Sequence, residues 1–241
     1  MIKTWENLYE QTKPILDKHY PDYESAKDYA KQFLNNNLQQ GDVVLDLGCG
    51  VHSEDFVAVK HKIKLVGVDF DQQSGQANRL LDDFKQADLN KELPFNDNSF
   101  DVVYSRFVIE HLQNPAKTYQ EVYRILKPGA YFIILTPNLY NKLIFLSKIL
   151  PISLHKFLRA KLTGVKEEEV FPTYYRSNRP AKIKKQLKTS GFKNIKIIKK
   201  GGLFEYFMAN KFLFILMIYL EKLTDHIFKF TKLHLVIICQ K

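Results

Sequence analysis

A run of apolar residues that leads directly into a glycine-rich turn constrains the fold of this chain more than any other feature. The run is Val44-Leu45-Asp46-Leu47-Gly48-Cys49-Gly50, which predicts a buried strand followed by a tight turn. Glycines in such a turn let backbone N–H groups approach a ligand with no side chain in the way. About 20 residues later a second apolar run ends at Gly67-Val68-Asp69. An acid at the end of that next strand is placed to accept hydrogen bonds from a ribose diol.

Short apolar runs alternate with helical patterns over the first 138 residues. The apolar runs occupy residues 43–47, 65–68, 102–104 and 131–135. Apolar positions at helical spacing predict amphipathic helices over residues 22–38 and 115–126. Strands that alternate with helices predict an α/β fold, with a parallel sheet covered by helices on both faces.

The alternation stops after residue 138. A helix is predicted over residues 178–190, and strands are predicted over residues 192–200 and 234–240. An apolar helical stretch, residues 203–233, separates these two strands. A length of 241 residues suits one α/β domain. Within that single domain, residues 1–241, we distinguish these parts: an N-terminal helical segment (1–40), a core with the glycine-rich turn (41–138), and helical lid or insertion segments (139–177 and 201–233).

Charge is unevenly distributed along the chain. Residues 1–138 contain 15 Lys and Arg against 20 Asp and Glu, whereas residues 139–241 contain 21 against 6. A basic segment of this kind attracts anionic substrates, nucleic acid or an anionic membrane surface, and a solvated lysine-rich face is the simple alternative. Apolar residues make up 45% and charged residues 26%, which excludes a disordered, collagen-like or polytopic membrane chain.

Cysteine is scarce in this sequence. Cys49 and Cys239 are too few and too far apart for a disulfide framework or a zinc motif, so we predict no metal site. A reducing cytoplasm is therefore the expected compartment. The first residues contain no apolar signal region.

The motifs together resemble those of the class I S-adenosylmethionine-dependent methyltransferases, close to the subgroup that acts largely on small molecules. Residues 44–50 resemble the first motif of that family, and the sequence VGVDF at residues 66–70 resembles the second. The later motifs are matched by Gln86-Ala87-Asp88-Leu89, by the strand-four stretch 93–112 and by the turn and strand at 125–138. The resemblance covers roughly residues 40–138, which makes 41–138 the cofactor-binding core.

This resemblance implies a Rossmann-like sheet of seven strands in the order 3-2-1-4-5-7-6, with only strand seven antiparallel. The two C-terminal strands predicted above would be strands six and seven. The cofactor would lie in the cleft outside the carboxyl ends of the strands, as in other open α/β sheets.

The same resemblance implies S-adenosylmethionine as the cofactor and S-adenosylhomocysteine as its product. The residues that match the family's cofactor contacts are Asp46, Gly48, Cys49, Gly50, Asp69, Phe70, Asp88, Leu89, Ser105 and Arg106. The first four would form the turn near the methionine part of the cofactor. The next pair would bind the ribose and lie beside the adenine, the third pair would flank the adenine, and the last pair would line the sulfonium end.

Each implied acid has a structural alternative. Asp46 could brace the loop or cap a helix, Asp69 could be a plain surface acid, and Asp88 could be a turn residue. The family's turn often has a third small residue where this chain has His52. That imidazole would contact the carboxylate of the cofactor, narrow the cleft or point to solvent.

A methyl group on a sulfonium is already electrophilic. The protein must therefore align a nucleophile, exclude water and, where needed, remove a proton. The candidate base is His111, just after strand four, because an imidazole exchanges protons near neutral pH. A packing role is its alternative, and Glu110 is a weaker candidate. Arg106 would hold an anionic group of the substrate or pair with a local acid.

Two aromatic residues and a cation precede the helix predicted at 178–190. Tyr174, Tyr175 and Arg176 are candidate substrate contacts at the expected mouth of the cleft. Packing of the helix onto the sheet is the alternative role for at least one of the tyrosines.

The stretch from Leu203 to Leu220 has 15 apolar residues out of 18. A membrane span needs about 20 such residues, and a single crossing would separate strands six and seven, which must pair. Three interpretations stay open: a buried helix over the substrate cavity, a dimer interface, or a surface docked on lipid. Basic charge beside apolar surface favours anionic lipid and a location peripheral to the membrane.

The predicted function is methyl transfer to a small acceptor, apolar or lipid-like, with O-methylation preferred over N- or C-methylation. An RNA or protein methyltransferase that uses the basic C-terminal part is one alternative, and a non-catalytic cofactor-binding module is another. Nucleic acid is disfavoured as a partner because strand four ends in Ser105-Arg106-Phe107, not in the Asn/Asp-Pro-Pro-aromatic motif used on nucleic-acid amines.

Overall fold

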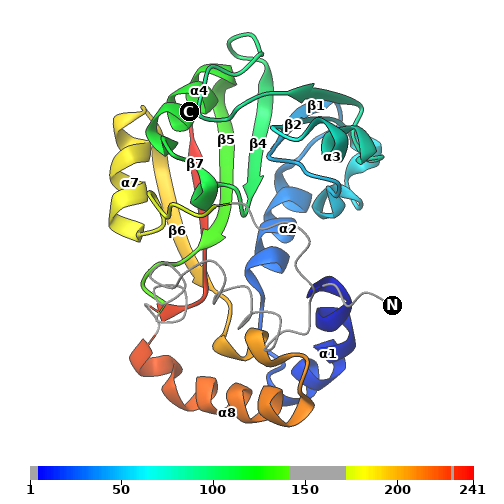
Figure 1. Cartoon of the computed structure of the whole chain (residues 1–241), viewed down its shortest axis with the longest axis vertical. Helices are drawn as coiled ribbons and strands as arrows, with labels where there is room; N and C mark the ends of the chain where they lie inside the picture. Colours follow the sequence, from blue (N-terminus) through cyan, green and yellow to red (C-terminus); the bar gives the residue numbers. More distant parts are fainter. Residues whose placement is uncertain (1–4, 142–171, 229–230) are drawn as a thin grey trace. The chain divides into compact units, whose positions relative to one another are not determined.

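The computed structural model describes residues 5–141, 172–228 and 231–241 (Figure 1). Within these residues the helices are α1 (Trp5–His19), α2 (Ala26–Asn37), α3 (Gln72–Ala77), α4 (Pro115–Ile125), α7 (Pro180–Thr189) and α8 (Lys211–Phe228). The strands are β1 (Asp42–Leu47), β2 (Ile63–Asp69), β3 (Asp83–Gln86), β4 (Phe100–Arg106), β5 (Leu126–Pro137), β6 (Lys193–Lys200) and β7 (His234–Gln240). Short 3₁₀ turns lie at Glu54–Phe56, Lys60–Lys62, Ile109–His111 and Leu203–Phe207.

The strands form one sheet in the order β3-β2-β1-β4-β5-β7-β6. The pairs β1–β2, β1–β4, β2–β3 and β4–β5 are parallel. Strand β7 is antiparallel to β5. Ala130, near the start of β5, accepts a hydrogen bond from Lys241 beyond the end of β7, whereas Asn138, beyond the end of β5, donates to Leu233 before the start of β7. The predicted seven-stranded Rossmann-like sheet is therefore confirmed.

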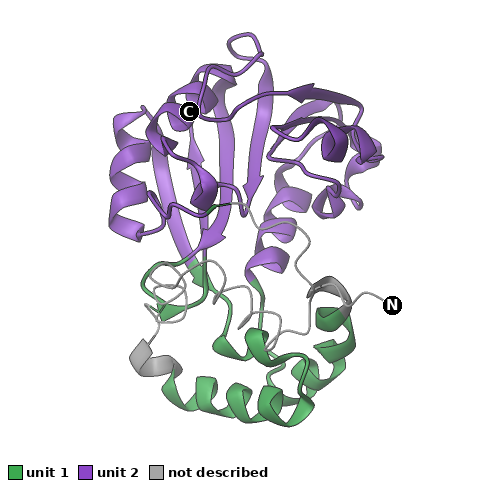
Figure 2. Cartoon of the chain, viewed as in Figure 1, with its two compact units in different colours: residues 1–25, 138–172, 199–234 green, residues 26–137, 173–198, 235–241 purple. Residues whose placement is uncertain are grey.

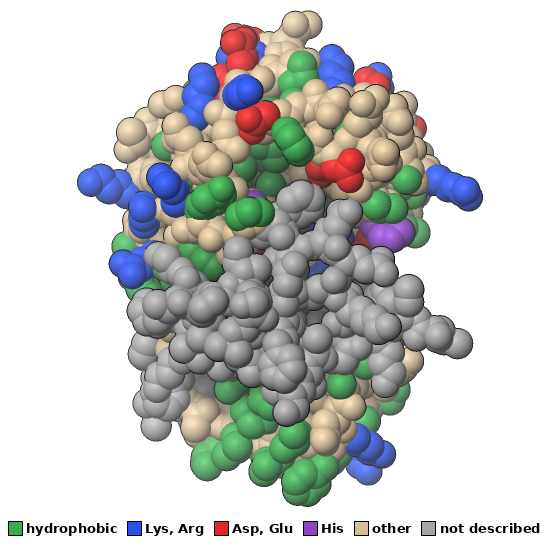
Figure 3. All heavy atoms as spheres, in the orientation of Figure 1, with side chains coloured by type: hydrophobic (Ala, Val, Ile, Leu, Met, Phe, Trp, Pro, Cys, Tyr) green, Lys and Arg blue, Asp and Glu red, His purple; other side chains and the backbone are tan. Residues whose placement is uncertain are grey.

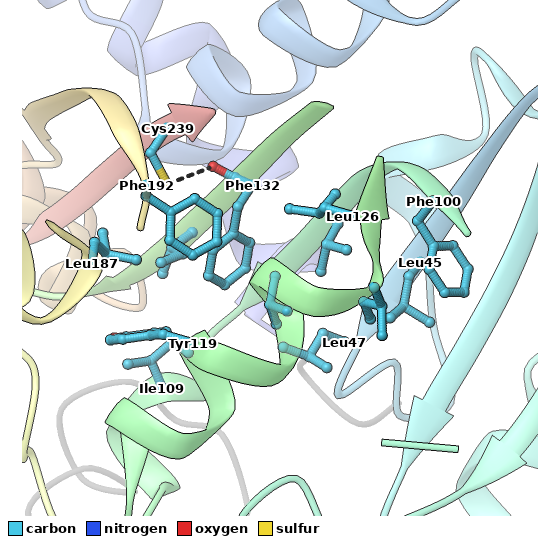
Figure 4. Close-up of a cluster of buried hydrophobic side chains, with 14 of the residues drawn as sticks. Leu45, Leu47, Phe100, Ile109, Tyr119, Leu126, Phe132, Leu187, Phe192 and Cys239 are labelled. Atoms are coloured by element: carbon cyan, nitrogen blue, oxygen red, sulfur yellow. Dashed lines mark hydrogen bonds between the residues drawn. The ribbon is translucent and has the colours of Figure 1, made fainter. Parts of the chain in front are cut away.

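Apolar side chains cover both faces of the sheet. Successive side chains of a strand point to opposite faces, so a strand that is buried on both sides is apolar throughout. Leu45 and Leu47 of β1 pack with Tyr119 of α4 on one face (Figure 4). Val44 packs with Leu34 of α2 on the other face. The functional turn that follows β1 thus begins from a strand that is fixed on both sides.

The helices of the sheet layers agree with the sequence patterns in type, with shifts at their ends. The pattern at 22–38 corresponds to α2, and the pattern at 178–190 corresponds to α7. Helix α4 begins where the sequence supplies a cap. The Asn114 side chain accepts a hydrogen bond from the Lys117 amide at 3.4 Å, and Pro115 occupies the first turn.

Strand β3 has no apolar run to indicate it. It pairs with β2 from Asp83, opposite Val66, to Gln86, opposite Asp69. Strand β3 lies at the edge of the sheet, where charged residues are common because they discourage pairing with other chains. Only the seven-stranded order that the family resemblance implies called for a strand between β2 and β4.

The chain divides into two compact units (Figure 2). One unit comprises residues 26–137, 173–198 and 235–241, and it contains nearly all of the sheet. The other unit comprises residues 1–25, 138–172 and 199–234. The site described below belongs entirely to the first unit.

The second unit has its own core, formed by α1, the turn Leu203–Phe207 and α8. Its buried members are Leu8, Leu16, Phe204, Met208, Phe214 and Ile218. The Tyr23 hydroxyl donates a hydrogen bond to the carboxylate of Glu205, which also accepts one from the Gly202 amide at 3.0 Å. The predicted apolar insertion is thus a helical element with a core of its own.

Most of the lid segment predicted at 139–177 falls on residues 142–171, which lie outside the described residues. No helix among the residues that the structure describes is both long enough and apolar enough to span a membrane.

Candidate functional site

The turn after β1 is tied directly to the end of β2. The amides of Gly48 and Cys49 both donate to the carbonyl oxygen of Val68, at 2.8 and 3.2 Å. Gly48 has a φ of +78° and Gly50 a φ of +50°, a backbone region that side chains other than glycine adopt at a cost. A Cβ added at Gly50 would meet no atom within 4 Å. The backbone at Gly50 is therefore open to a ligand.

Replacing Gly48 by Ala is expected to lower the free energy of unfolding by about 2–4 kcal/mol, because left-handed strain adds to a steric clash. A Cβ at Gly48 would lie 2.3 Å from Cγ2 of Val108. Gly129 has the same φ of +78° but open space, so Gly129→Ala is the matched control, with an expected loss of about 1 kcal/mol. Urea denaturation of both variants measures the difference. Equal losses would mean that Val108 moves aside freely.

The side chain of Asn78 forms hydrogen bonds with the turn, although no sequence pattern indicated a role for this residue. Its amide nitrogen lies 3.4 and 3.2 Å from the carbonyl oxygens of Cys49 and Gly50, and 2.8 Å from Oγ of Ser53. Asn78 is buried and directly follows α3. One side chain thus fixes the shape of the whole loop from 49 to 53.

Asp69 connects the end of β2 to the turn. Its Oδ2 accepts a hydrogen bond from the Gly50 amide at 2.9 Å, and its Oδ1 accepts one from the Asp71 amide at 3.0 Å. Each carboxylate oxygen has two lone pairs, so both atoms can accept a further hydrogen bond. The neighbouring Phe70 is 66% exposed. The expected ribose and adenine residues therefore stand beside the glycine turn, with accepting capacity and an exposed aromatic ring.

A small pocket opens beside this turn. Its volume is about 40 Å³, and its lining residues are Asp46, Gly48, Cys49, His52, Ser53, Asp55, Phe56, Tyr104 and Arg106. Asp46 is buried and accepts a hydrogen bond from Ser53 Oγ at 2.6 Å. Burial raises the pKa of the Asp46 carboxyl to about 7, although the Ser53 hydrogen bond and the positive charge of Arg106 favour its ionised form. The pocket thus holds a carboxyl group that would be stabilised by a bound cation.

Arg106 pairs with acids of the 3₁₀ turn that follows the glycine loop. Its Nη1 lies 2.7 Å from Oε1 of Glu54, and its Nε lies 3.3 Å from Oδ2 of Asp55. Burial disfavours the charge of Arg106, but Asp55 and Glu54 outweigh this effect and raise the pKa of the guanidinium. The Tyr104 hydroxyl also donates to Asp55, at 2.7 Å. Of the two roles considered for Arg106, the structure therefore shows the pairing with local acids.

Asp88 and Leu89 follow β3. Oδ1 of Asp88 accepts hydrogen bonds from the backbone and side-chain nitrogens of Asn90, both at 3.0 Å, which is the pattern of a turn. The bond from the Asn90 backbone amide is the largest cause that lowers the pKa of Asp88. Leu89 is buried in the core on the α4 side of the sheet. The turn that was the alternative role of Asp88 is thus present. The other carboxylate oxygen of Asp88, Oδ2, lies 3.7 Å from Nζ of Lys91.

A buried polar cluster lies at the carboxyl ends of β4 and β5. Oγ1 of Thr136 donates to Oε2 of Glu110 at 3.0 Å, and the Asn178 amide nitrogen donates to Thr136 at 2.7 Å. Ser105 is fully buried, and its Oγ has no hydrogen-bond partner among the described residues. Burial raises the pKa of the Glu110 carboxyl to about 7. The sequence indicated Glu110 only as a weak candidate base and did not indicate its burial.

The Glu110→Gln variant is expected to raise the free energy of unfolding by roughly 2–3 kcal/mol at pH 8 and by nearly nothing at pH 4. The pKa of Glu110 rises from 4.5 in the unfolded chain to about 7 in the folded one. The stability associated with this group is complete below about pH 4.5 and is lost as the pH rises to about 7. Denaturant titrations at both pH values measure the change. The exposed Glu92 offers the control Glu92→Gln, and a similar gain there would show that net charge is responsible.

The segment before α7 lies against the 3₁₀ turn Ile109–His111. The backbone amides of Tyr174 and Tyr175 donate to the carbonyl oxygen of Glu110, at 2.8 and 3.1 Å. Tyr175 is buried and has a φ of +49°, whereas Tyr174 is half-buried and its ring lies 5.9 Å from Cζ of Arg176. His111 is also half-buried. The candidate base and the candidate substrate residues therefore belong to adjoining backbone segments.

Comparison with known proteins finds methyltransferase matches over part of this chain. Residues 45–134 match a family model described as a methyltransferase domain. Phosphoethanolamine N-methyltransferase 3 of Arabidopsis thaliana is 34% identical over 113 residues, with 43% of this chain and 23% of that protein covered. Cycloartenol-C-24-methyltransferase 1 of Oryza sativa subsp. japonica is 33% identical over 111 residues, with 42% of this chain and 32% of that protein covered.

The fold comparison agrees with the family model. The crystal structure of an S-adenosylmethionine-dependent methyltransferase from Mesorhizobium loti aligns with a TM-score of 0.59 at 19% identity, and the alignment covers 90% of this chain and 98% of that one. Residues 45–134 of this chain belong to a methyltransferase domain. The resemblance found in the sequence motifs is therefore confirmed for residues 45–134, the part of the chain that the family model matches.

The matched region of the methyltransferase domain begins in β1 and ends in β5, so it includes the glycine turn, Asp69 and the end of β4. The chain covers only 23% and 32% of the length of the two curated relatives named above. The matched region thus lies within the predicted core at 41–138, and the segments after residue 138 lie beyond it.

Proposed function

We propose that this chain binds S-adenosylmethionine at the carboxyl ends of β1 and β2 and transfers its methyl group to a small, apolar or lipid-like acceptor. One observation carries the proposal most strongly. The buried carboxyl of Asp46 lies in a pocket beside a glycine turn whose backbone is open to a ligand. Bound S-adenosylmethionine supplies an electrophilic methyl group on a positively charged sulfur.

The pocket residues suit the parts of this cofactor. Asp46 offers a buried negative charge to the ammonium group of the methionine part, and His52 at the pocket rim suits the methionine carboxylate. The open backbone at Gly50 permits close approach. Asp69 has lone pairs left for the ribose hydroxyls, and the exposed ring of Phe70 can lie beside the adenine. The pocket of about 40 Å³ encloses only one end of such a molecule, so the rest would lie over the strand ends.

The acceptor side is assigned to the ends of β4 and β5. The unsatisfied Ser105 Oγ supports a role for this residue at the reacting end, because a buried hydroxyl without a partner is costly. Because Arg106 already pairs with Glu54 and Asp55, we assign it to the wall of the pocket and not to an anionic group of the substrate. The side chain of His111 is the proposed proton acceptor, and Tyr174, Tyr175 and Arg176 are the proposed substrate contacts.

The names of the relatives support a lipid-related acceptor. One is named for phosphoethanolamine and one for cycloartenol, a sterol, and these names specify N- and C-methylation. O-methylation, preferred on the sequence alone, therefore stays a prediction without support from these relatives. The accepting atom is best determined from the product.

Two measurements test this function. Titration calorimetry with S-adenosylmethionine and S-adenosylhomocysteine is expected to show binding with a stoichiometry of one. Incubation of a total lipid and metabolite extract with methyl-deuterated cofactor, followed by mass spectrometry, is expected to show a labelled small molecule. Binding without any labelled product would support a non-catalytic module. Label in added RNA, with affinity that falls steeply with salt, would support the RNA-directed alternative.

A further inference from the structure

Helix α8 has two apolar faces instead of one. Its inward face, with Phe214, Met217 and Ile218, packs in the core of the second unit. Its outward residues are also apolar, and we call them the outer face of α8: Phe212, Leu213, Leu216, Tyr219, Leu220 and Leu223. Their spacing of three and four residues places them along one side of the helix.

The outer face of α8 is a continuous patch and not a scatter of single residues. It contains six of the eleven large hydrophobic side chains that are exposed in the described part of the chain. Phe212 and Leu223 are 75% and 76% exposed. Figure 3 shows hydrophobic side chains gathered over the region of α8. A solvated helix face is normally polar, so such a patch indicates a binding surface.

The charges around the outer face of α8 are basic. Lys211 and Lys222 are exposed, at the start of the helix and next to Leu223. The acids of the described side chains at 199–224 point inward: Glu205 is buried, and Glu221 is bound by Lys232 at 2.8 Å and by the Leu203 amide at 3.2 Å. Apolar surface edged by lysine, with the carboxylates turned away, complements an anionic surface.

We propose that the outer face of α8 docks on an anionic lipid surface, with its apolar side chains in the headgroup boundary and Lys211 and Lys222 beside the lipid phosphates. This inference rests on the proposed function and deepens it. It proposes that the protein encounters its lipid-like acceptor at a membrane surface. A second copy of this chain is less well suited to the face. It would bring the same lysines and, among the helix side chains described at 211–224, no exposed carboxylate to oppose them.

The test is flotation of the full chain with vesicles. Unmodified protein is expected to float with vesicles of equal parts phosphatidylglycerol and phosphatidylcholine, and at least tenfold less with phosphatidylcholine alone or at high salt. Leu223→Glu places a carboxylate on the exposed outer face and is expected to reduce flotation at least tenfold. Val57 is 62% exposed in the other unit, so Val57→Glu is the matched control and is expected to float normally. Lys211→Glu is expected to weaken binding to the anionic vesicles and to leave the weak binding to phosphatidylcholine vesicles unchanged.

The outcomes separate this inference from the proposed function. Calorimetry with S-adenosylmethionine needs no vesicles, and the Leu223→Glu variant is expected to retain both its cofactor affinity and its circular dichroism spectrum. Equal flotation of Leu223→Glu and unmodified protein would overturn the docking while leaving methyl transfer intact. A dimer in light scattering that dissociates in Leu223→Glu, with no vesicle binding by either protein, would assign the face to a second copy instead.

Discussion

The Asp46→Asn variant is expected to be more stable than the unmodified protein and to bind S-adenosylmethionine about a hundredfold more weakly at pH 8. The carboxyl is buried in the pocket, and its main fixed partner is the hydroxyl of Ser53 at 2.6 Å. Burial of this charge outweighs the Ser53 hydrogen bond and the positive charge of Arg106 and destabilises the ligand-free fold, whereas the ammonium group of the cofactor would compensate it. Removal of the charge therefore has opposite effects on folding and on binding.

The sign of the effect on stability follows from the pKa. Burial raises the pKa of Asp46 from 3.8 to about 7. The stability associated with this group is complete below about pH 4 and is lost as the pH rises to about 7. One pKa unit corresponds to about 1.4 kcal/mol, so the gain in Asp46→Asn at pH 8 is expected to be roughly 4 kcal/mol and to vanish near pH 4. Denaturant titrations of the ligand-free protein measure the gain, and calorimetry measures the affinity for the cofactor.

Asp42 provides the matched control for this variant. It lies at the other end of the same strand, and its side chain accepts a hydrogen bond from the Gln39 amide at 2.8 Å, outside the pocket. Asp42→Asn is expected to leave cofactor affinity unchanged. If Asp46→Asn gained stability but kept full affinity, Asp46 would be a residue that braces the loop, which was its alternative role in the sequence.

The sequence was most informative where one local pattern determines the structure. A strand that is buried on both faces must be apolar throughout, and β1, β4 and β7 were therefore visible as apolar runs. Helix α4 was visible because Pro115 and an amphipathic pattern coincide. No sequence pattern predicted strand β3, because an edge strand of four residues needs no apolar face. The division into two units was also hidden, since it depends on contacts between distant segments.

In the site, too, the sequence predicted residues that belong to one local motif and did not predict contacts between residues far apart in the chain. The turn at Gly48 and the acid at Asp69 could be located from their spacing, because a strand, a turn and the next strand form one local unit. Asn78 holds three atoms of the turn, yet it is an ordinary polar residue in the sequence. The pairing of Arg106 with Glu54 spans 52 residues, and no local pattern can predict a contact of that kind.

The His111→Gln variant is expected to lower kcat by about a hundredfold while leaving the affinity for S-adenosylmethionine unchanged. A positioned general base contributes on the order of 10²–10⁴ to the rate, and glutamine is similar in size but cannot accept a proton near neutral pH. The measurement is kcat on the acceptor identified by isotope labelling, at saturating cofactor, from about pH 5.5 to 8.5. The acid limb of the pH profile is expected to disappear in the variant, because a base must be neutral to accept a proton.

Two further variants isolate the imidazole of His111 from its surroundings. Glu110 precedes it and has a pKa raised by burial to about 7, so its titration would overlap with that of an imidazole. Glu110→Gln is therefore expected to keep the acid limb that His111→Gln loses. His61, exposed in the 3₁₀ turn Lys60–Lys62, provides the control His61→Gln, which should retain full activity. An acid limb that disappears in Glu110→Gln and persists in His111→Gln would transfer the role of base to the carboxylate. If kcat is unchanged in both variants, alignment of the acceptor and exclusion of water would account for the rate without any base.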